Sequence, residues 1–218
     1  RTMARRLVFY IDEQNNFTQK EIKFKWYPGF SQTQLEKSIK ELHEKFEVEE
    51  PNKKILEVSS ASSSRIAKKA GAFSLEVVTS HGKYSVEQLF QAGKVFKNHG
   101  SRQELLTLSS KDAKQANKEI NSHDTLIGFK IFEASFPLIP KTYFYNWTYL
   151  KALEQNPGIA SEIAKYDAFT DIFFNDQKSF NCQAQACSIY VSLLRRRLLK
   201  KALSSRNDFL KVVYGNSL

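Results

Sequence analysis

The chain has 218 residues with a formal net charge of +10, and 41% of the residues are hydrophobic. This length suits one domain with a sizeable core, to which 17 Phe, 9 Tyr and 2 Trp contribute large apolar surfaces. No apolar run approaches the ~18 residues of a membrane-spanning helix, and no apolar targeting segment follows the N-terminal charges, so we expect a cytoplasmic protein without a membrane partner. The excess positive charge favours acidic partners such as nucleic acid or phosphorylated ligands.

The N-terminal part of the chain is predicted to form two strands and a helix. Residues 7–11 are apolar, and residues 21–27 alternate between apolar and polar after a polar loop over residues 12–19. A helix is expected to begin at Ser31, because Gln34 follows three residues later as in a capping box. Its apolar stripe consists of Leu35, Ile39, Leu42 and Phe46.

Two further strands are predicted before the middle of the chain. They cover residues 53–59 and 72–80, and the Ser-rich, basic residues 60–69 between them form either a loop or a short helix. The turn pair His81-Gly82 then leads into a second capped helix, over residues 85–96.

This second helix carries the most informative pattern of the sequence. Ser85 with Gln88 is a capping box. At 100° per residue, one face is apolar and consists of Val86, Leu89, Phe90, Gly93 and Phe96. Spacings of i, i+4 and i+7 place three polar residues together beside that face, namely Glu87, Gln91 and Lys94. A carboxylate and an amine lining one groove can carry out proton transfer and imine chemistry, whereas the alternative is an ordinary solvated helix face.

The second half of the chain is predicted to be mostly helical. We expect helices over residues 109–120, 142–154, 157–166 and 181–202, and strands over residues 125–132 and 169–174. The expected fold class is therefore α+β, a helix-rich single domain with a small sheet of short strands.

The cysteines and histidines predict neither a disulfide nor a metal site. Cys182 and Cys187 are five residues apart in the last predicted helix and lie on different faces, so we expect reduced thiols. The four His lack zinc-ligand spacing, and the eight Gly include no Walker or dinucleotide-binding fingerprint, so we expect no metal and no cofactor. Residues 189–218 carry seven Lys or Arg against one Asp; these cations either follow phosphates or complement the end of a helix.

Residues 82–94 resemble the signature of the NADAR (YbiA-like) family. They contain a Gly and an aromatic residue, then Ser-Val-Glu, then Phe-Gln-Ala and a closing Lys. Residues 72–75 look like the Ser-Asn-Phe strand of that family, with Ser74 where Asn is usual. Residues 166–171 and 181–184 are similar to its threonine–glycine–acid segment and to the start of its final helix.

The likeness extends from about residue 22 to about residue 199. Residues 24–30 and 55–60 look like the family branch encoded beside DarT-type toxins, which ADP-ribosylate guanine in DNA. Phe173-Phe174 stands where the family has a Trp-Gly pair. The resemblance implies three parts, which are a strand-strand-helix-strand extension over residues 3–70, a catalytic core over residues 71–203, and a basic tail over residues 204–218.

The resemblance implies an ADP-ribosyl glycohydrolase that removes ADP-ribose from guanine bases in DNA. It would act as an antitoxin, with a DarT-type toxin as its genetic partner and a candidate physical one. Glu87 and Lys94 would be the catalytic residues. The ligand-binding residues implied by the motif match are Phe73, Ser74, Phe90, Gln91, Asp171, Phe174 and Asn181.

Two mechanisms are open at this point. In the first, Lys94 attacks ribose C1 as a neutral amine to form a Schiff base, and Glu87 moves the proton. In the second, Glu87 deprotonates a water and Lys94 only binds a phosphate or a ribose hydroxyl. Because an ionised Glu87 raises the pKa of Lys94, the first mechanism requires burial against Phe90 or the charge of Lys83 to lower it again.

Other functions and simpler structural roles also fit the sequence. The protein could be an N-glycosidase acting on a small riboflavin-pathway intermediate, or a non-catalytic module that binds nucleic acid or the toxin. Phe73 and Phe174 could be core residues, Asn181 a helix cap, and Asp171 the partner of a core Arg or Lys.

Overall fold

The N-terminal strands pair along their whole length. In the computed structural model, which describes residues 2–215, β1 (Met3–Ile11) and β2 (Phe17–Lys25) form an antiparallel hairpin. Met3 lies opposite Lys25 and Ile11 lies opposite Phe17. Both strands begin four residues earlier than predicted, and β2 ends at Lys25, two residues before the predicted end. Backbone pairing across the hairpin sets these bounds, and it does not require the alternating side-chain pattern on which the prediction was based.

These strands belong to a four-stranded sheet with the order β2-β1-β10-β3. β10 (Ala168–Thr170) is antiparallel to β1 and parallel to β3 (Ile55–Glu57). The sheet thus takes strands from both residues 3–70 and residues 71–203, and the division at residue 70 stays a prediction.

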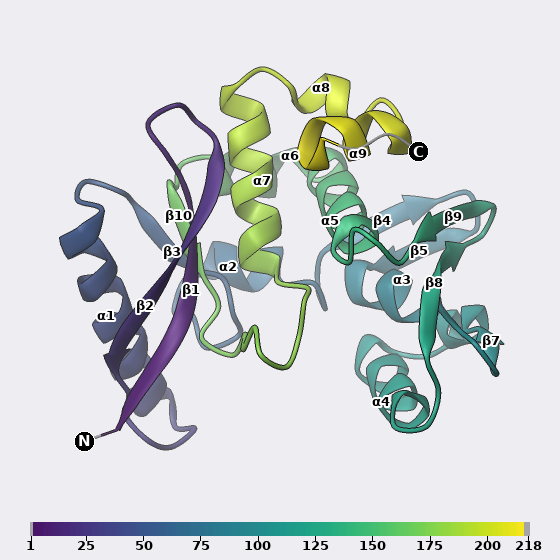
Figure 1. The fold of residues 1–218 in the computed structure, drawn as a ribbon, viewed down its shortest axis with the longest axis horizontal. Helices are drawn as coiled ribbons and strands as arrows, with labels where there is room; N and C mark the ends of the chain where they lie inside the picture. The colour runs from purple at the N-terminus through teal and green to yellow at the C-terminus, as the bar shows by residue number, and fades with distance from the viewer. Residues whose placement is uncertain (1, 216–218) are drawn as a thin grey trace.

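Both faces of this sheet are covered. Alternate residues of β1 point to opposite sides, so Val8 packs with the buried face of α1 (Gln32–Glu49) while Phe9 joins the main core with α7 (Gln183–Arg195). Figure 1 shows α1 on the outer side of the sheet and α7 on its inner side. Ser31 is the N-cap of α1 as predicted, because its Oγ accepts a hydrogen bond from Gln34 N at 3.2 Å. The Gln34 side chain does not complete a capping box; its Nε2 donates to Pro28 O at 3.0 Å.

Three helices stand between the two halves of the molecule, namely α2 (Arg65–Ala70), α5 (Tyr143–Gln155) and α6 (Pro157–Ile163). The buried Tyr149 hydroxyl of α5 donates a hydrogen bond to Ala70 O of α2 at 2.6 Å. The aromatic residues of α5 continue into a buried cluster with Phe90 and Phe129, which joins the helices to the second half of the chain.

The other half contains two smaller sheets, two α-helices and a short 3-10 helix (Figure 1). One sheet is the hairpin of β4 (Glu76–Thr79) and β5 (Gly82–Ser85). The other has the order β7-β6-β8-β9, formed by Gly100–Ser101, Lys94–Phe96, Leu126–Ile131 and Ala134–Pro137. Beside them lie α3 (Val86–Ala92), α4 (Ser110–Asn121) and the 3-10 helix Gln103–Thr107. The α+β class is confirmed, with short strands in three sheets rather than one within residues 2–215.

The end of the chain differs from the prediction. The helix expected over residues 181–202 is wrong beyond Arg195, because Arg197 adopts a left-handed conformation with φ of 60°. The shorter α8 (Leu199–Ala202) and α9 (Arg206–Tyr214) follow, and α9 buries Phe209 in the core. Within the described range, 2–215, no helix is long and apolar enough to cross a bilayer.

Candidate functional site

The start of α3 is fixed by local hydrogen bonds. Ser85 Oγ accepts from Gln88 N at 3.0 Å, and Gln88 Oε1 accepts from Ser85 N at 2.8 Å. The predicted capping box is therefore confirmed. It places Glu87 in the first turn, where the helix dipole favours a carboxylate.

Lys94 does not lie on this helix, which corrects the sequence interpretation. α3 ends at Ala92, Gly93 follows as its C-cap, and Lys94 is the first residue of β6. Two tertiary contacts end the helix here: Gly93 packs closely against Phe144, and Gly93 O accepts a hydrogen bond from Lys130 N of β8 at 2.7 Å. The predicted i+7 spacing on one helical flank therefore does not describe Lys94.

The side chain of Lys94 nevertheless packs against α3. Its Nζ lies 4.9 Å from the centre of the Phe90 ring, and Phe90 is buried beside Tyr145. Burial lowers the pKa of Lys94, Glu87 raises it, and Lys114 of α4 lowers it further, with a lowered pKa as the net result. Burial and Lys114 thus act in the direction that the first mechanism requires. Lys83 takes no part in this balance and forms an ion pair with Glu76 at 3.5 Å.

The predicted Glu87 and Gln91 form a direct pair. Gln91 Nε2 donates to Glu87 Oε1 at 2.8 Å, and the two residues are only 4% and 6% exposed, respectively. An i, i+4 pair on a helix is the contact that the spacing predicted. In this buried position it is not the solvated surface pair of the alternative interpretation.

Asp171, which follows β10, belongs to the same charged cluster. Burial raises its pKa, while the backbone N–H groups of Phe173 and Phe174 and the charges of Arg6 and Lys114 lower it, so that the net shift is upward. Lys114 thus acts on both Asp171 and Lys94. The charge of Lys114 in α4 therefore connects Asp171, after β10, with Lys94 of β6, which packs on Phe90 of α3.

Tyr145 of α5 completes this cluster and was not expected from the sequence. Burial raises its pKa well above the ordinary tyrosine value, and the charges of Glu87 and Asp171 act in the same direction. Neither Tyr145 nor Lys114 carried a sequence signal, because each is one of several similar residues in its own helix.

The remaining predicted residues lie around this cluster in different ways. Phe73 is 47% exposed, and Lys114 Nζ lies 5.4 Å from the centre of its ring, so Phe73 is a rim residue rather than a core residue. Ser74 is exposed in the turn after α2, where its backbone N–H donates to Gly71 O. Asn181 does not cap α7, because Cys182 occupies the N-cap position, and the buried Oδ1 atom of Asn181 has no hydrogen-bond partner.

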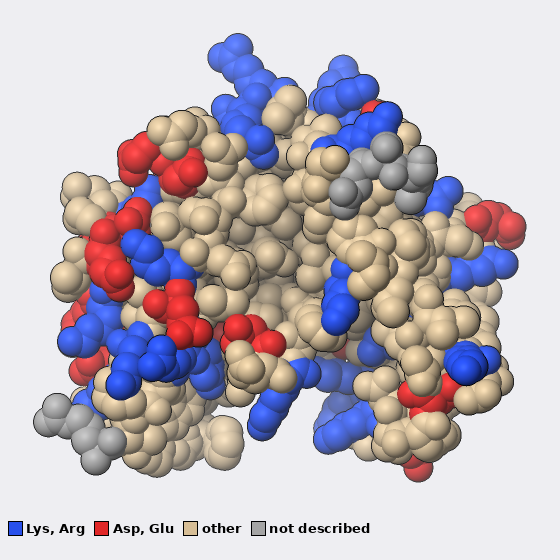
Figure 2. All heavy atoms as spheres, viewed as in Figure 1, with Lys and Arg blue, Asp and Glu red and all other residues tan. Residues whose placement is uncertain are grey.

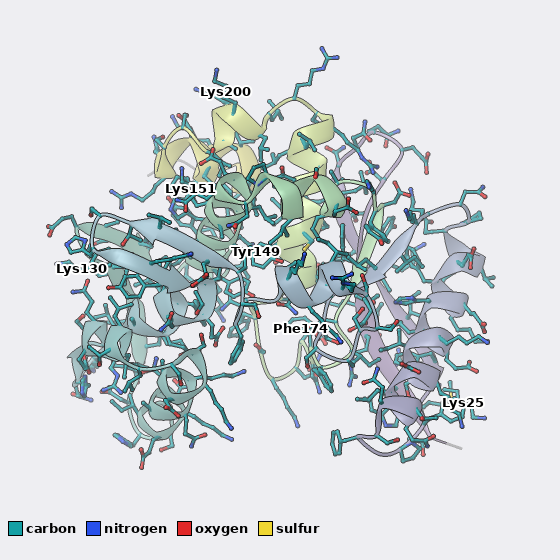
Figure 3. All side chains as sticks on the ribbon, turned by 180° about the vertical axis from the view of Figure 1, so that it is seen from behind. Lys25, Lys130, Tyr149, Lys151, Phe174 and Lys200 are labelled. Atoms are coloured by element: carbon teal, nitrogen blue, oxygen red, sulfur yellow. The ribbon has the colours of Figure 1, made fainter. Side chains whose placement is uncertain are left out.

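Phe174 lies in the middle of the molecule, between its two halves (Figure 3). Its ring centre is 6.2 Å from that of Phe9, and it lines a cavity of about 350 Å³ together with Lys141, Phe180 and Gln185. The partly buried Phe174 is thus both a packing residue and a cavity wall. Cys182 and Cys187 are buried free thiols, as predicted.

A separate cavity of about 550 Å³ lies between α1 and β3 and contains none of the predicted residues. His43 and Glu57 line this cavity, and Thr170 joins them, because its Oγ1 contacts His43 Nε2 and donates to Glu57 Oε1, both at 2.7 Å. Burial lowers the pKa of His43 to about 4. Burial, reinforced by Asp171, raises the pKa of Glu57 to about 7.

Comparison with known proteins identifies the family of the chain. No curated protein matches the chain. The family model for DarT1-associated NADAR antitoxins matches residues 4–218, which is nearly the whole sequence. The chain therefore belongs to the family of DarT1-associated NADAR antitoxins.

Proposed function

We propose that this protein is an ADP-ribosyl glycohydrolase that removes ADP-ribose from guanine bases in DNA and so opposes a DarT-type toxin. The observation that carries the proposal is the position of Lys94: its Nζ lies 4.9 Å from the centre of the buried Phe90 ring, on the helix that also carries the buried Glu87. In this position burial lowers the pKa of Lys94. A lysine whose ammonium form is disfavoured has a larger fraction of neutral amine, which is the nucleophilic form.

The proposed reaction begins at the bond between ribose C1 and the guanine nitrogen. Opening of the ribose ring gives an imine-like C1, and the neutral Nζ of Lys94 adds to it. The Glu87 carboxylate takes the proton that the attacking Nζ loses and passes it to the guanine nitrogen. The C1–N bond then breaks, the guanine amine leaves, and a Schiff base remains on Lys94. Water adds to the resulting Schiff base, ADP-ribose leaves, and the lysine amine is regenerated.

The alternative mechanism uses the same two residues differently. Glu87 would take a proton from water, and Lys94 would hold a phosphate or a ribose hydroxyl as an ammonium ion. The lowered pKa of Lys94 favours the Schiff-base route, since an ammonium ion that only binds an anion gains nothing from losing its proton.

The charge distribution supports a polyanionic substrate. Figure 2 shows a notch between the two halves at the lower edge of the molecule, with Lys and Arg side chains on both sides. The C-terminal basic residues lie elsewhere: in Figure 3 Lys200 is at the top of the molecule, whereas Phe174 is in its middle. We therefore assign substrate attraction to the lysines beside the cluster, Lys114 above all, rather than to the C-terminal residues.

The test is incubation with DNA that carries ADP-ribosylated guanine, followed by detection of free ADP-ribose. Glu87→Ala and Lys94→Ala should each lower the rate by about 100-fold or more, because a positioned acid or base contributes ~10²–10⁴. Lys83→Ala is the matched control: it removes an exposed lysine of the preceding strand and should leave the rate unchanged. Full activity in both the Glu87 and Lys94 variants would overturn the proposal.

A further inference from the structure

A line of hydrogen-bonded, buried polar side chains leads from Glu87 through α3 and α4 to Arg102, the residue before the 3-10 helix. Asn117 of α4 donates from Nδ2 to Gln91 Oε1 at 2.8 Å and to Gln91 O at 2.7 Å. Arg102 donates from Nε to Asn117 Oδ1 at 3.0 Å. Asn117 is 1% exposed and Arg102 is 8% exposed, so water does not compete for these bonds.

Arg102 fixes the direction of every bond in this line. A guanidinium can only donate, so the oxygen of Asn117 faces Arg102 and its NH₂ group faces Gln91. The oxygen of Gln91 then faces Asn117, and its NH₂ group faces Glu87. Neither amide can rotate by 180° without placing two donors or two acceptors against each other.

We propose that Asn117 and Arg102 are positioning residues that, through Gln91, orient the carboxyl group of Glu87. Gln91 presents an N–H to Oε1, which stabilises an ionised oxygen there and leaves Oε2 for proton transfer. The role in catalysis rests on the function proposed above, whereas the effect on Glu87 itself does not.

Arg102 is held by further contacts. Its Nη1 forms an ion pair with Glu104 Oε1 at 3.1 Å and lies 2.8 Å from His99 Nε2. The line therefore begins at a charged group bound on two sides, and it ends at the carboxylate of the candidate site. If the network only joined α3 to α4, presenting either the oxygen or the NH₂ group of Gln91 to Glu87 would serve equally well. The proposed role requires the NH₂ group.

The substitution that separates these roles is Asn117→Asp. The new side chain has the same shape and keeps an acceptor for Arg102, now as an ion pair, but it has no N–H for Gln91. The Gln91 amide is then expected to turn its NH₂ group toward residue 117 and its oxygen toward Glu87. Two acceptors would face each other, which disfavours the ionised carboxylate.

The first measurement is a titration of Glu87 by NMR in protein labelled with ¹³C at the Glu carboxyl groups, with Glu87→Gln to identify the signal. Asn117→Asp should move the midpoint of this titration to higher pH by about one unit or more, and in the Gln91→Met background it should cause no further shift. An unchanged midpoint in Asn117→Asp would overturn the proposal. This readout needs no catalytic activity, so an inactive wild-type protein would refute the proposed function and not this inference.

The second measurement is the pH dependence of ADP-ribose release. Asn117→Asp should lower kcat by about 10- to 100-fold, leave KM little changed, and move the acid limb of the profile to higher pH. Asn146→Asp is the matched control, because Asn146 is also buried in a helix and donates to Tyr214 Oη at 3.0 Å. It should affect stability without moving either pH curve. If Asn117→Asp does not fold, Asn117→Ala replaces it, because alanine also has no donor for Gln91, and it should shift the titration in the same direction; no shift there also overturns the proposal.

Discussion

The amine of Lys94 lies 4.9 Å from the centre of the Phe90 ring, although Phe90 belongs to α3 and Lys94 to β6. The ring face replaces part of the water that would otherwise solvate the ammonium ion. Lys94 therefore lies outside α3 in the chain, but its side chain packs against the helix that carries Glu87, and its pKa is lowered there. The chemistry proposed here depends on that contact.

Replacing Lys94 with Arg distinguishes the two mechanisms. An Arg keeps the positive charge but stays protonated, so it can bind a phosphate and cannot form a Schiff base. We expect Lys94→Arg to lower kcat by about 100-fold or more and to give no covalent adduct when the reaction is quenched with borohydride. Lys83→Arg should behave as the wild type in both assays. Activity within tenfold of wild type would favour water as the nucleophile.

The pH profile should respond to Lys114. Because its charge lowers the pKa of Lys94, Lys114→Ala should raise that pKa and move the rising limb of kcat to higher pH. Activity at neutral pH should fall as a result. Lys118→Ala removes another exposed lysine of α4 and serves as the control, since Lys118 is not among the charges that act on Lys94. Equal shifts in both variants would indicate a general effect of net charge.

The His43–Thr170–Glu57 chain should give two opposite pH dependences of stability. The pKa of Glu57 is raised to about 7, so its protonated form favours folding, and this contribution is lost as the pH rises from about 4.5 through 7. The pKa of His43 is lowered to about 4, so its contribution is lost as the pH falls from about 6.5 through 4.

Urea unfolding between pH 4 and pH 8 would separate the two contributions. Relative to wild type, Glu57→Gln should gain stability as the pH rises through 7, by about 3 kcal/mol at most. Relative to wild type, His43→Gln should gain stability as the pH falls below 6, because the variant has no imidazole to protonate. Parallel curves for wild type and both variants would contradict the assignment.

Gly93 is expected to tolerate no side chain. A Cβ there would lie 2.5 Å from Cε2 of Phe144, so Gly93→Ala should destabilise the protein by about 1–3 kcal/mol and displace Lys94 next to it. Gly158→Ala is the matched control, because a Cβ there meets nothing within 4 Å, and it should be neutral or slightly stabilising. Thermal unfolding of both variants, together with the activity of Gly93→Ala, checks this expectation.

The sequence was most informative where structure is local. The caps at Ser31 and Ser85 and the pairing of Glu87 with Gln91 follow from contacts between residues three or four apart, so they could be read directly. The same holds for α4, which begins next to Ser109 as expected from the predicted range 109–120, and there Ser109 Oγ accepts from Asp112 N. The resemblance to the family could also be recognised from the sequence, because the signature lies within residues 82–94.

Where elements end, and which distant residues meet, was decided by tertiary structure. α3 ends at Ala92 because Gly93 O accepts a hydrogen bond from β8 and Gly93 packs against the Phe144 ring. Both partners are distant from Gly93 in the sequence. Lys114 and Asn117 reach the site because α4 packs against α3. The sequence alone places a carboxylate, an amide and an amine (Glu87, Gln91 and Lys94) within one short segment. Long-range packing then determines how far the amine is removed from water and which way each amide group points.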